Sequence, residues 1–268
     1  MLNILVCVKQ VPDTTQVKID PVKHTLIRTG VPSILHTFDT YALETALQLR
    51  EAAGGGKITV ISMGPEQAKA VLREALSVGA DETYLISDRA FGGADTLATS
   101  RTLAAAVDLL EKKNGIPFDL ILCGKQAIDG DTGQVGPELS QHLGCSLITY
   151  AVGAELTEDG IRAKRESDEG YDYYTAPLPA VITMNKTPYD MRWPNLTCWR
   201  RARAAEIPVL TANEVIVPED KRGLKGSPTK VKRTYTPVHE KNGQKLEGLS
   251  AGEAAAKLVE LMGAAKLI

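Results

Sequence analysis

The stretch DLILCGKQAIDGDTGQVGPEL, residues 119–139, passes from a short apolar run into a loop of glycines and acidic residues and then into a second apolar pattern. The apolar run is typical of a buried β-strand, which we expect to end at Gly124. A helix is predicted from about Gln134 to His142, with Thr132 as its N-cap. A strand, a glycine-rich loop and a helix in this order indicate one βα unit of an α/β fold.

The loop of this unit has the features of a phosphate site, with one difficulty. Gly130 and Gly133 permit tight turns with positive φ, and the start of the following helix offers unpaired N–H groups at the positive end of its dipole. Asp129 and Asp131 would repel a phosphate unless they bind ribose hydroxyls or the backbone of the loop itself. The residues alone therefore leave two interpretations open, a nucleotide site and a glycine-rich turn with aspartates as caps.

Similar units precede this one along the chain. Strands are predicted at residues 3–8, 57–62 and 82–87, and helices at 40–53, 65–78 and 96–113, the first with Asp39 or Thr40 as its N-cap. Continuous apolar strands that alternate with helices predict a mostly parallel sheet with helices on both faces, a Rossmann-like α/β fold. Ligands of such sheets lie beyond the carboxyl ends of the strands, so the loops at 7–12, 63–64, 87–96 and 124–134 should share one rim.

The second half of the chain follows another pattern. Strand-like runs at 146–156, 160–167, 171–176 and 179–184 are joined by short turns, which predicts added antiparallel strands. The segment from Tyr189 onward lacks clear periodicity and reads as an extended arm, but it ends in a helix with Ser250 and Glu253 in a capping-box pattern. The pattern therefore predicts an α/β domain at 1–188 and, at 189–268, an arm whose terminal helix needs a surface to dock on; the resemblance described below implies that the first is the nucleotide-binding domain and that the second includes a partner-recognition loop.

Composition excludes several classes of function. A net charge of −2 gives no argument for a nucleic-acid partner, and there is no run of roughly 18 uncharged apolar residues, so we expect a cytoplasmic protein without membrane insertion. Four scattered cysteines without a CxxC pair suggest neither zinc nor a redox dithiol. The four histidines are isolated, and no catalytic side-chain group is visible. Any chemistry should therefore belong to a cofactor.

A second glycine pair raises a rival interpretation. The stretch GGADTLATS, residues 92–100, resembles the pyrophosphate loop of ATP pyrophosphatases and adenylating enzymes. In those enzymes the loop follows the first strand, whereas here it follows the third, and Phe91 stands where they have serine. The same stretch could instead receive a second phosphate-bearing ligand at the start of a second helix on the rim.

Three segments carry a resemblance to a known family. GKQAIDGDTGQVGPELS (124–140), NILVCVKQVPD (3–13) and AKRESDEGYDYYTAPLPAVIT (163–183) resemble the β subunit of electron transfer flavoprotein, and the similarity covers essentially the whole chain. The resemblance implies a heterodimer with an α subunit that carries FAD. In ordinary members the β subunit holds AMP, and in electron-bifurcating members it holds a second FAD that takes a hydride from NADH. The stretches 129–137 and 223–231 resemble the bifurcating group, which favours FAD.

The resemblance also implies site residues and partners. An ordinary member would hold AMP as a structural ligand, and a bifurcating member would pass electrons to ferredoxin or flavodoxin and, through the α-subunit FAD, to a flavin-dependent dehydrogenase. His36 and Thr37 depart from the Asn-Pro that is usual in the family, and Leu196 matches the leucine of its partner-recognition loop. NADH is expected at Gly92, Gly93, Asp95 and Thr96. The residues expected to bind the adenine nucleotide are Cys7, His36, Thr37, Phe38, Asp39, Met63, Gly124, Lys125, Gln126, Ala127, Ile128, Asp129, Gly130, Asp131, Thr132, Gly133, Gln134 and Val135.

Overall fold

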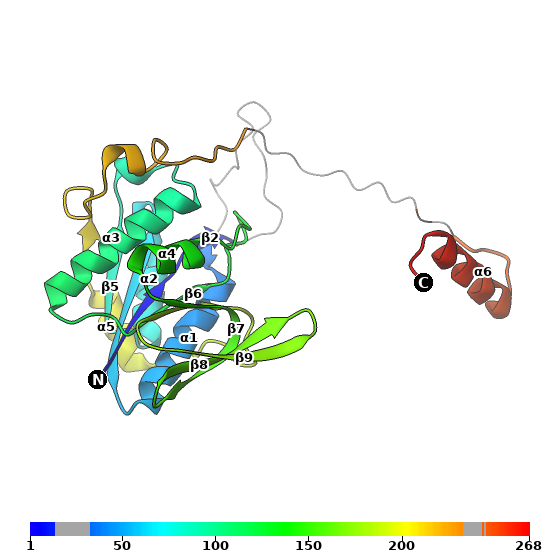
Figure 1. The fold of residues 1–268 in the computed structure, drawn as a ribbon, viewed down its shortest axis with the longest axis horizontal. Coiled ribbons are helices and arrows are strands. Elements are labelled where there is room, and N and C mark those ends of the chain that lie inside the picture. The colour runs from blue at the N-terminus through cyan, green and yellow to red at the C-terminus, as the bar shows by residue number, and fades with distance from the viewer. Residues whose placement is uncertain (14–32, 233–242, 244) are drawn as a thin grey trace.

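A nine-stranded sheet forms the centre of the protein (Figure 1). The computed structural model describes residues 1–13, 33–232, 243 and 245–268. The strand order is β11-β5-β4-β1-β6-β10-β7-β8-β9. The strands are β1 (Leu2–Cys7), β4 (Gly56–Met63), β5 (Glu82–Ile86), β6 (Leu120–Gly124), β7 (Ser146–Thr157), β8 (Gly160–Ser167), β9 (Gly170–Ala176), β10 (Ala180–Met184) and β11 (Val209–Leu210).

The central strands are parallel and buried on both faces, which explains their continuous apolar sequences. In β1, Val6 lies between Val60 of β4 and Leu122 of β6. Helices α1 (Thr37–Ala52) and α2 (Lys69–Val78) pack on one face of the sheet, and α3 (Thr96–Asn114) and α4 (Val135–Leu143) pack on the other. The predicted α/β class with helices on both faces is therefore confirmed.

The far edge of the sheet changes direction, as the second half of the sequence predicted. Strand β7 runs parallel to β10, and β8 and β9 then add as an antiparallel hairpin. A second, two-stranded antiparallel sheet joins β2 (Gln10–Pro12) to β3 (Ser33–Leu35). The stretches VKID (17–20) and TLIRTG (25–30), whose sequence is compatible with a small hairpin, fall outside the described residues.

Three predicted helix starts differ from the structure. Helix α1 begins three residues early, after His36, whose carbonyl accepts the N–H groups of Asp39 and Thr40. The predicted helix from Pro65 is a 3-10 turn, η1 (Glu66–Ala68), that continues into α2. Thr132 does not cap α4, because that helix starts after Gln134 and has no side-chain cap. Asp39, one of the two expected caps of α1, lies within the first turn of the helix, and its carboxylate accepts hydrogen bonds from the N–H groups of Lys9 and Gly124.

The segment after Tyr189 is more regular than the predicted extended arm. Helix α5 (Leu196–Ala204) has Asn195 as its N-cap and packs on α2, and β11 pairs with β5 in the main sheet. A 3-10 turn, η3 (Glu219–Lys221), follows. The other 3-10 turn, η2 (Arg89–Phe91), precedes α3. The prediction of an irregular arm is therefore wrong for residues 196–210, which are part of the α/β unit.

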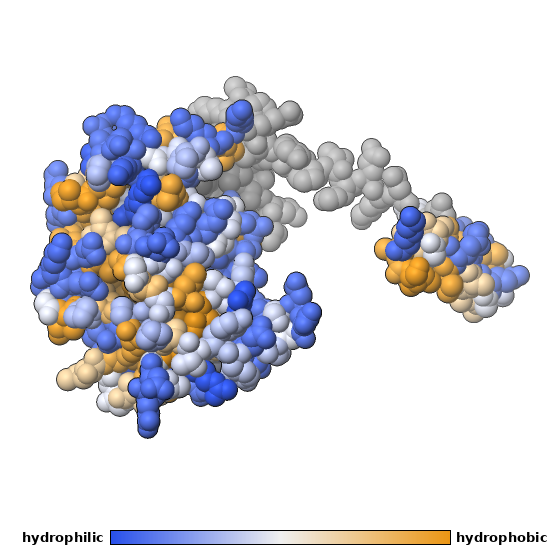
Figure 2. All heavy atoms as spheres, in the orientation of Figure 1, coloured by the Kyte–Doolittle hydropathy of each residue, from blue (hydrophilic) through white to orange (hydrophobic). Residues whose placement is uncertain are grey.

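The terminal helix α6 (Ala251–Ala264) has the predicted capping box between Ser250 and Glu253. It lies apart from the sheet and its helices in Figure 1, and none of its residues is buried. Figure 2 shows hydrophobic side chains on the surface of this helix. Leu258 and Val259 of α6 are 53% and 57% exposed. In the described part of the chain, no helix is long and apolar enough to cross a membrane.

Candidate functional site

The carboxyl ends of β1, β4 and β6 form the rim on which most of the predicted site residues lie. Cys7 at the end of β1 is in register with Cys123, next to Gly124 at the end of β6. Asp39, from the first turn of α1, joins these two strand ends. Its Oδ2 accepts the N–H of Lys9 at 2.7 Å, and its Oδ1 accepts the N–H of Gly124 at 2.9 Å. One buried carboxylate therefore fixes the start of the loop at 124–135.

Burial and these hydrogen bonds act on Asp39 in opposite directions. Burial raises the pKa of its carboxyl to about 7, although the N–H groups of Lys9 and Gly124 favour the charged form. The contact also explains the glycine. A Cβ atom on residue 124 would lie 2.4 Å from Asp39 Oδ1 and 2.8 Å from Phe38 Cβ, so no other residue fits without moving α1.

His36 makes a second connection to the same loop. Its ring is buried, and Nε2 accepts the N–H of Ile128 at 3.1 Å. Burial lowers the pKa of His36, so the imidazole is neutral near pH 7, as an accepting nitrogen requires. The resemblance placed His36 against the nucleotide, and the structure gives its ring an additional contact, to the backbone of the loop.

Asp129 and Asp131, the two acids that made the phosphate interpretation difficult, have side-chain partners within the protein. Asp129 forms an ion pair with Lys9, with 2.6 Å between Nζ and Oδ1, and its side chain is 12% exposed. Asp131 accepts a hydrogen bond from the side-chain amide of Gln126, and its own φ is +51°. Both carboxylates thus have a partner that offsets their charge or satisfies their oxygens. This arrangement reduces the electrostatic objection to an anion at the loop.

The loop leads into α4, which packs tightly on the sheet. A Cβ atom on Gly136 would lie 2.4 Å from Thr183 Cγ2 and 3.0 Å from Cys123 Sγ. The N-cap Gln134 makes no side-chain cap hydrogen bond, so the cap does not satisfy the N–H groups of the first turn. Its side chain instead accepts from the hydroxyl of Thr96, the first residue of α3, at 2.9 Å. The starts of α3 and α4 therefore lie side by side.

The Gly92-Gly93 loop, expected to bind NADH, contacts the arm. The N–H of Leu224 donates to the carbonyl of Gly92 at 3.0 Å, and Leu224 packs beside Gly93. Asp95 caps α3 through the N–H of Ala98, and its other oxygen accepts from the N–H and hydroxyl of Thr229 at 2.9 and 2.7 Å. Sequence reasoning noted the stretch 223–231 as a family feature but missed that it covers this loop.

Leu196 lies away from the rim. It begins α5 and is 62% exposed, beside Trp193, which is 92% exposed. Later in the same helix, Arg201 donates to the carbonyl of Ala80, which precedes β5 and so lies near the amino ends of the strands. The exposed residues at the start of α5 therefore form a surface of their own, separate from the loop at 124–135.

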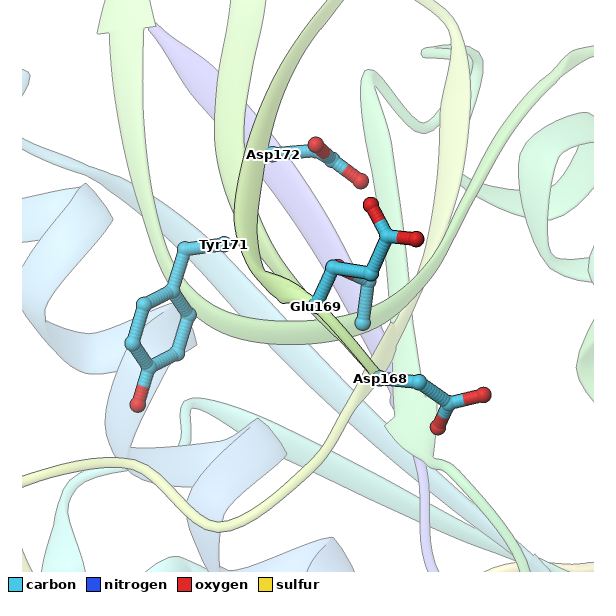
Figure 3. Close-up of a pocket in the computed structure, with 5 residues that line it drawn as sticks. Asp168, Glu169, Tyr171 and Asp172 are labelled. Carbon is cyan, nitrogen blue, oxygen red and sulfur yellow. The ribbon is translucent and has the colours of Figure 1, made fainter.

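Among the described residues, no group of three or more His, Cys, Asp or Glu side chains could hold a metal ion. Burial raises the pKa of Cys123 to about 12 and that of Cys7 well above its ordinary value, so both thiols stay protonated. A surface hollow at the tip of the β8–β9 hairpin is lined by acidic side chains and Tyr171, whose ring points away from the carboxylates in Figure 3. None of its residues belongs to the rim.

Comparisons with known proteins identify the family to which the chain belongs. The family model "Electron transfer flavoprotein domain" matches residues 23–215. The electron transfer flavoprotein subunit beta of Megasphaera elsdenii is 49% identical over the full length of both chains, and that of Thermoanaerobacterium thermosaccharolyticum is 44% identical over the same extent. The caffeyl-CoA reductase-Etf complex subunit CarD of Acetobacterium woodii is 42% identical over 96% of this chain and 97% of its own. The chain therefore belongs to the electron transfer flavoprotein family, and within it to the beta subunits.

Proposed function

We propose that this subunit binds FAD at the rim of its sheet and, together with an α subunit that carries its own FAD, takes electrons from NADH and divides them between two acceptors. The observation that carries the proposal is the loop at 124–135, which Asp39 and His36 attach to α1. A bound flavin supplies hydride acceptance and single-electron transfer, and the residues of the chain supply binding and orientation.

The residues of the loop fit a nucleotide. The first turn of α4 offers N–H groups that its N-cap side chain does not take, and the side chain of Lys125 supplies positive charge nearby. Lys125 lies over the rings of Phe38 and Tyr150, 5.3 and 5.4 Å from their centroids, which holds this cation at the rim. We assign pyrophosphate and ribose contacts to residues 124–135, with Cys7, Met63 and residues 36–39 around them.

The second glycine loop is our proposed NADH site. Because the carboxylate of Asp95 is engaged by Ala98 and Thr229, its role is to hold the arm in place. NADH would then contact the backbone of Gly92 and Gly93 and the hydroxyl of Thr96. The arm segment 223–229 would form one wall of this site, since it packs against both glycines.

A flavin count tests the proposal. We expect the heterodimer, produced with an α subunit of the same family, to release two FAD molecules per complex on denaturation. Anaerobic NADH should bleach the flavin absorbance rapidly. One FAD together with one AMP would contradict the proposal and support an AMP-holding scaffold, which the same loop could also serve.

We also propose that α6 docks on the α subunit and that the exposed start of α5 contacts a dehydrogenase. A helix with a capping box but no buried residue has its stabilising contacts elsewhere. Leu258→Asp should weaken binding to the α subunit by roughly ten- to a hundredfold, since burying one leucine contributes roughly 1.5–3 kcal/mol. Glu260→Gln, at a 67% exposed side chain, is the control and should bind normally. Analytical ultracentrifugation measures the dissociation constant of each variant from the α subunit. Equal affinities for both variants would place the interface elsewhere.

A further inference from the structure

His36 occupies a position from which it can control the loop. Its ring is 4% exposed, and its Nε2 accepts a hydrogen bond from the N–H of Ile128, 92 residues further along the chain. An imidazole nitrogen that accepts a hydrogen bond carries no proton, so the proton of the neutral ring is on Nδ1. The middle of the loop is thus held by an acceptor that exists only while His36 is uncharged.

The other side of the ring supports this protonation state. Nδ1 is buried and has no hydrogen-bond partner within the described residues. The nearest carboxylate oxygen is Asp39 Oδ2 at 3.9 Å, which already accepts from the N–H of Lys9. The ring of Phe38 lies against the imidazole with 5.6 Å between the ring centroids. Of the two ring nitrogens, Nε2 is therefore the one that forms a hydrogen bond, to the N–H of Ile128.

We propose that His36 is a pH-sensitive positioning residue: the neutral imidazole holds Ile128 and keeps the nucleotide loop closed, and a proton on Nε2 releases it. The link between this contact and nucleotide affinity rests on the function proposed above, whereas the contact itself does not. Protonation replaces the acceptor with a second donor, so two N–H groups then face each other. The loop must move, and the nucleotide contacts that depend on it weaken.

The charges around the ring come from three elements. Asp39 lies on α1 with His36, Lys9 comes from the loop after β1, and Asp129 comes from the nucleotide loop, where Lys125 also lies above Phe38. Burial lowers the pKa of His36 and Lys9 lowers it further, while Asp129 raises it. In a released loop the pKa returns towards its ordinary value of 6.5. The closed form therefore binds fewer protons, and acid favours the released form as the pH falls below 6.5.

Three heterodimers test the inference, each binding FAD and, separately, AMP between pH 5.5 and 8. In the wild type we expect nucleotide affinity to fall three- to tenfold from pH 7.5 to 5.5. This change corresponds to the net free energy of roughly one hydrogen bond. His36→Gln places an amide oxygen near the position of Nε2 and cannot gain a proton, so it should lose less affinity in acid than the wild type. The pH dependence that remains in this variant comes from the carboxyl of Asp39, whose pKa burial raises to about 7. His36→Leu has no acceptor and should bind three- to tenfold more weakly at pH 7.5.

Hydrogen exchange in the nucleotide-free heterodimer gives a readout that does not depend on the ligand. The peptide around Ile128 should exchange faster in His36→Leu than in His36→Gln at every pH, and the wild type should change from the slow to the fast behaviour on acidification. If this pattern appears but neither FAD nor AMP binds, the positioning role stands and the proposed function fails. The inference is overturned if His36→Gln loses as much affinity in acid as the wild type does. It is also overturned if the exchange rate of the peptide around Ile128 is the same in the wild type and in both His36 variants. A His36→Leu chain that does not fold leaves the comparison of wild type and His36→Gln decisive.

Discussion

Replacing Gly124 with alanine should lower the free energy of unfolding by about 3 kcal/mol, because the new methyl group overpacks the site and displaces a buried hydrogen-bond acceptor. The methyl carbon would lie 2.4 Å from Asp39 Oδ1. That oxygen must withdraw from the N–H of Gly124, and Asp39 also holds the N–H of Lys9. The junction of α1, β1 and β6 would loosen at the start of the nucleotide loop, so we expect nucleotide affinity to fall more than a hundredfold.

Urea unfolding and nucleotide titration of the same preparations measure both effects. Gly130→Ala is the matched substitution in the same loop, since its methyl group meets no atom within 4 Å. It should change the unfolding free energy by less than about 1 kcal/mol. If Gly124→Ala binds nucleotide as the wild type does, the loop does not depend on the Asp39 contact and our description of the site is wrong.

Replacing Arg192 with methionine should also cost about 3 kcal/mol, because it leaves a buried carboxylate without its cation. The guanidinium Nε and Nη2 of Arg192 donate to Glu44 at 3.0 and 2.9 Å, and its backbone N–H donates to the same carboxylate at 3.0 Å. The Glu44 side chain is 5% exposed. Arg192 also bonds to Glu51, so this one side chain holds the segment before α5 against α1.

The pH dependence of stability should also change in Arg192→Met. Burial raises the pKa of Glu44, but the hydrogen bonds from Arg192 outweigh burial and hold the pKa below its ordinary value of 4.5. The wild type therefore gains stability from this pair above pH 4.5 and loses it as the pH falls through the lowered pKa. In Arg192→Met the hydrogen bonds from the guanidinium are lost, while burial and the hydrogen bonds from the backbone N–H of residue 192 and from Gln48 remain. The pKa of Glu44 should therefore rise, and acid should relieve the destabilisation.

Urea unfolding at several pH values separates the pair from ordinary surface charge. Glu51→Gln, at a side chain that is 54% exposed, removes only the outer carboxylate and should cost less than about 1 kcal/mol. The double variant Glu44→Gln/Arg192→Met should recover part of the loss, since no buried charge is left. Equal stability of Arg192→Met and wild type would show that Glu44 is satisfied without its cation.

The elements that the sequence predicted well have strong local signals. The strand predicted at 119–124 is a continuous apolar run. The helix predicted at 96–113 is bounded by Asp95 and Gly115, which are its N-cap and C-cap in the structure. Helix α5 was missed because it lacks an apolar stripe, and of its residues only Ala202 is buried. Strand β11 has two residues and exists as a strand only through its pairing with β5.

The sequence by itself therefore determined the class of fold, the rim and the loop that lies on it, because apolar periodicity, glycines and capping residues act within a few positions of one another. Only the tertiary structure decided what each polar residue of the loop does. His36 reaches Ile128 across 92 residues, Lys9 reaches Asp129 across 120, and Asp95 reaches Thr229 across 134. No local pattern encodes such pairs, since the chain brings their members together only when the parallel strands assemble and collect their carboxyl ends at one edge.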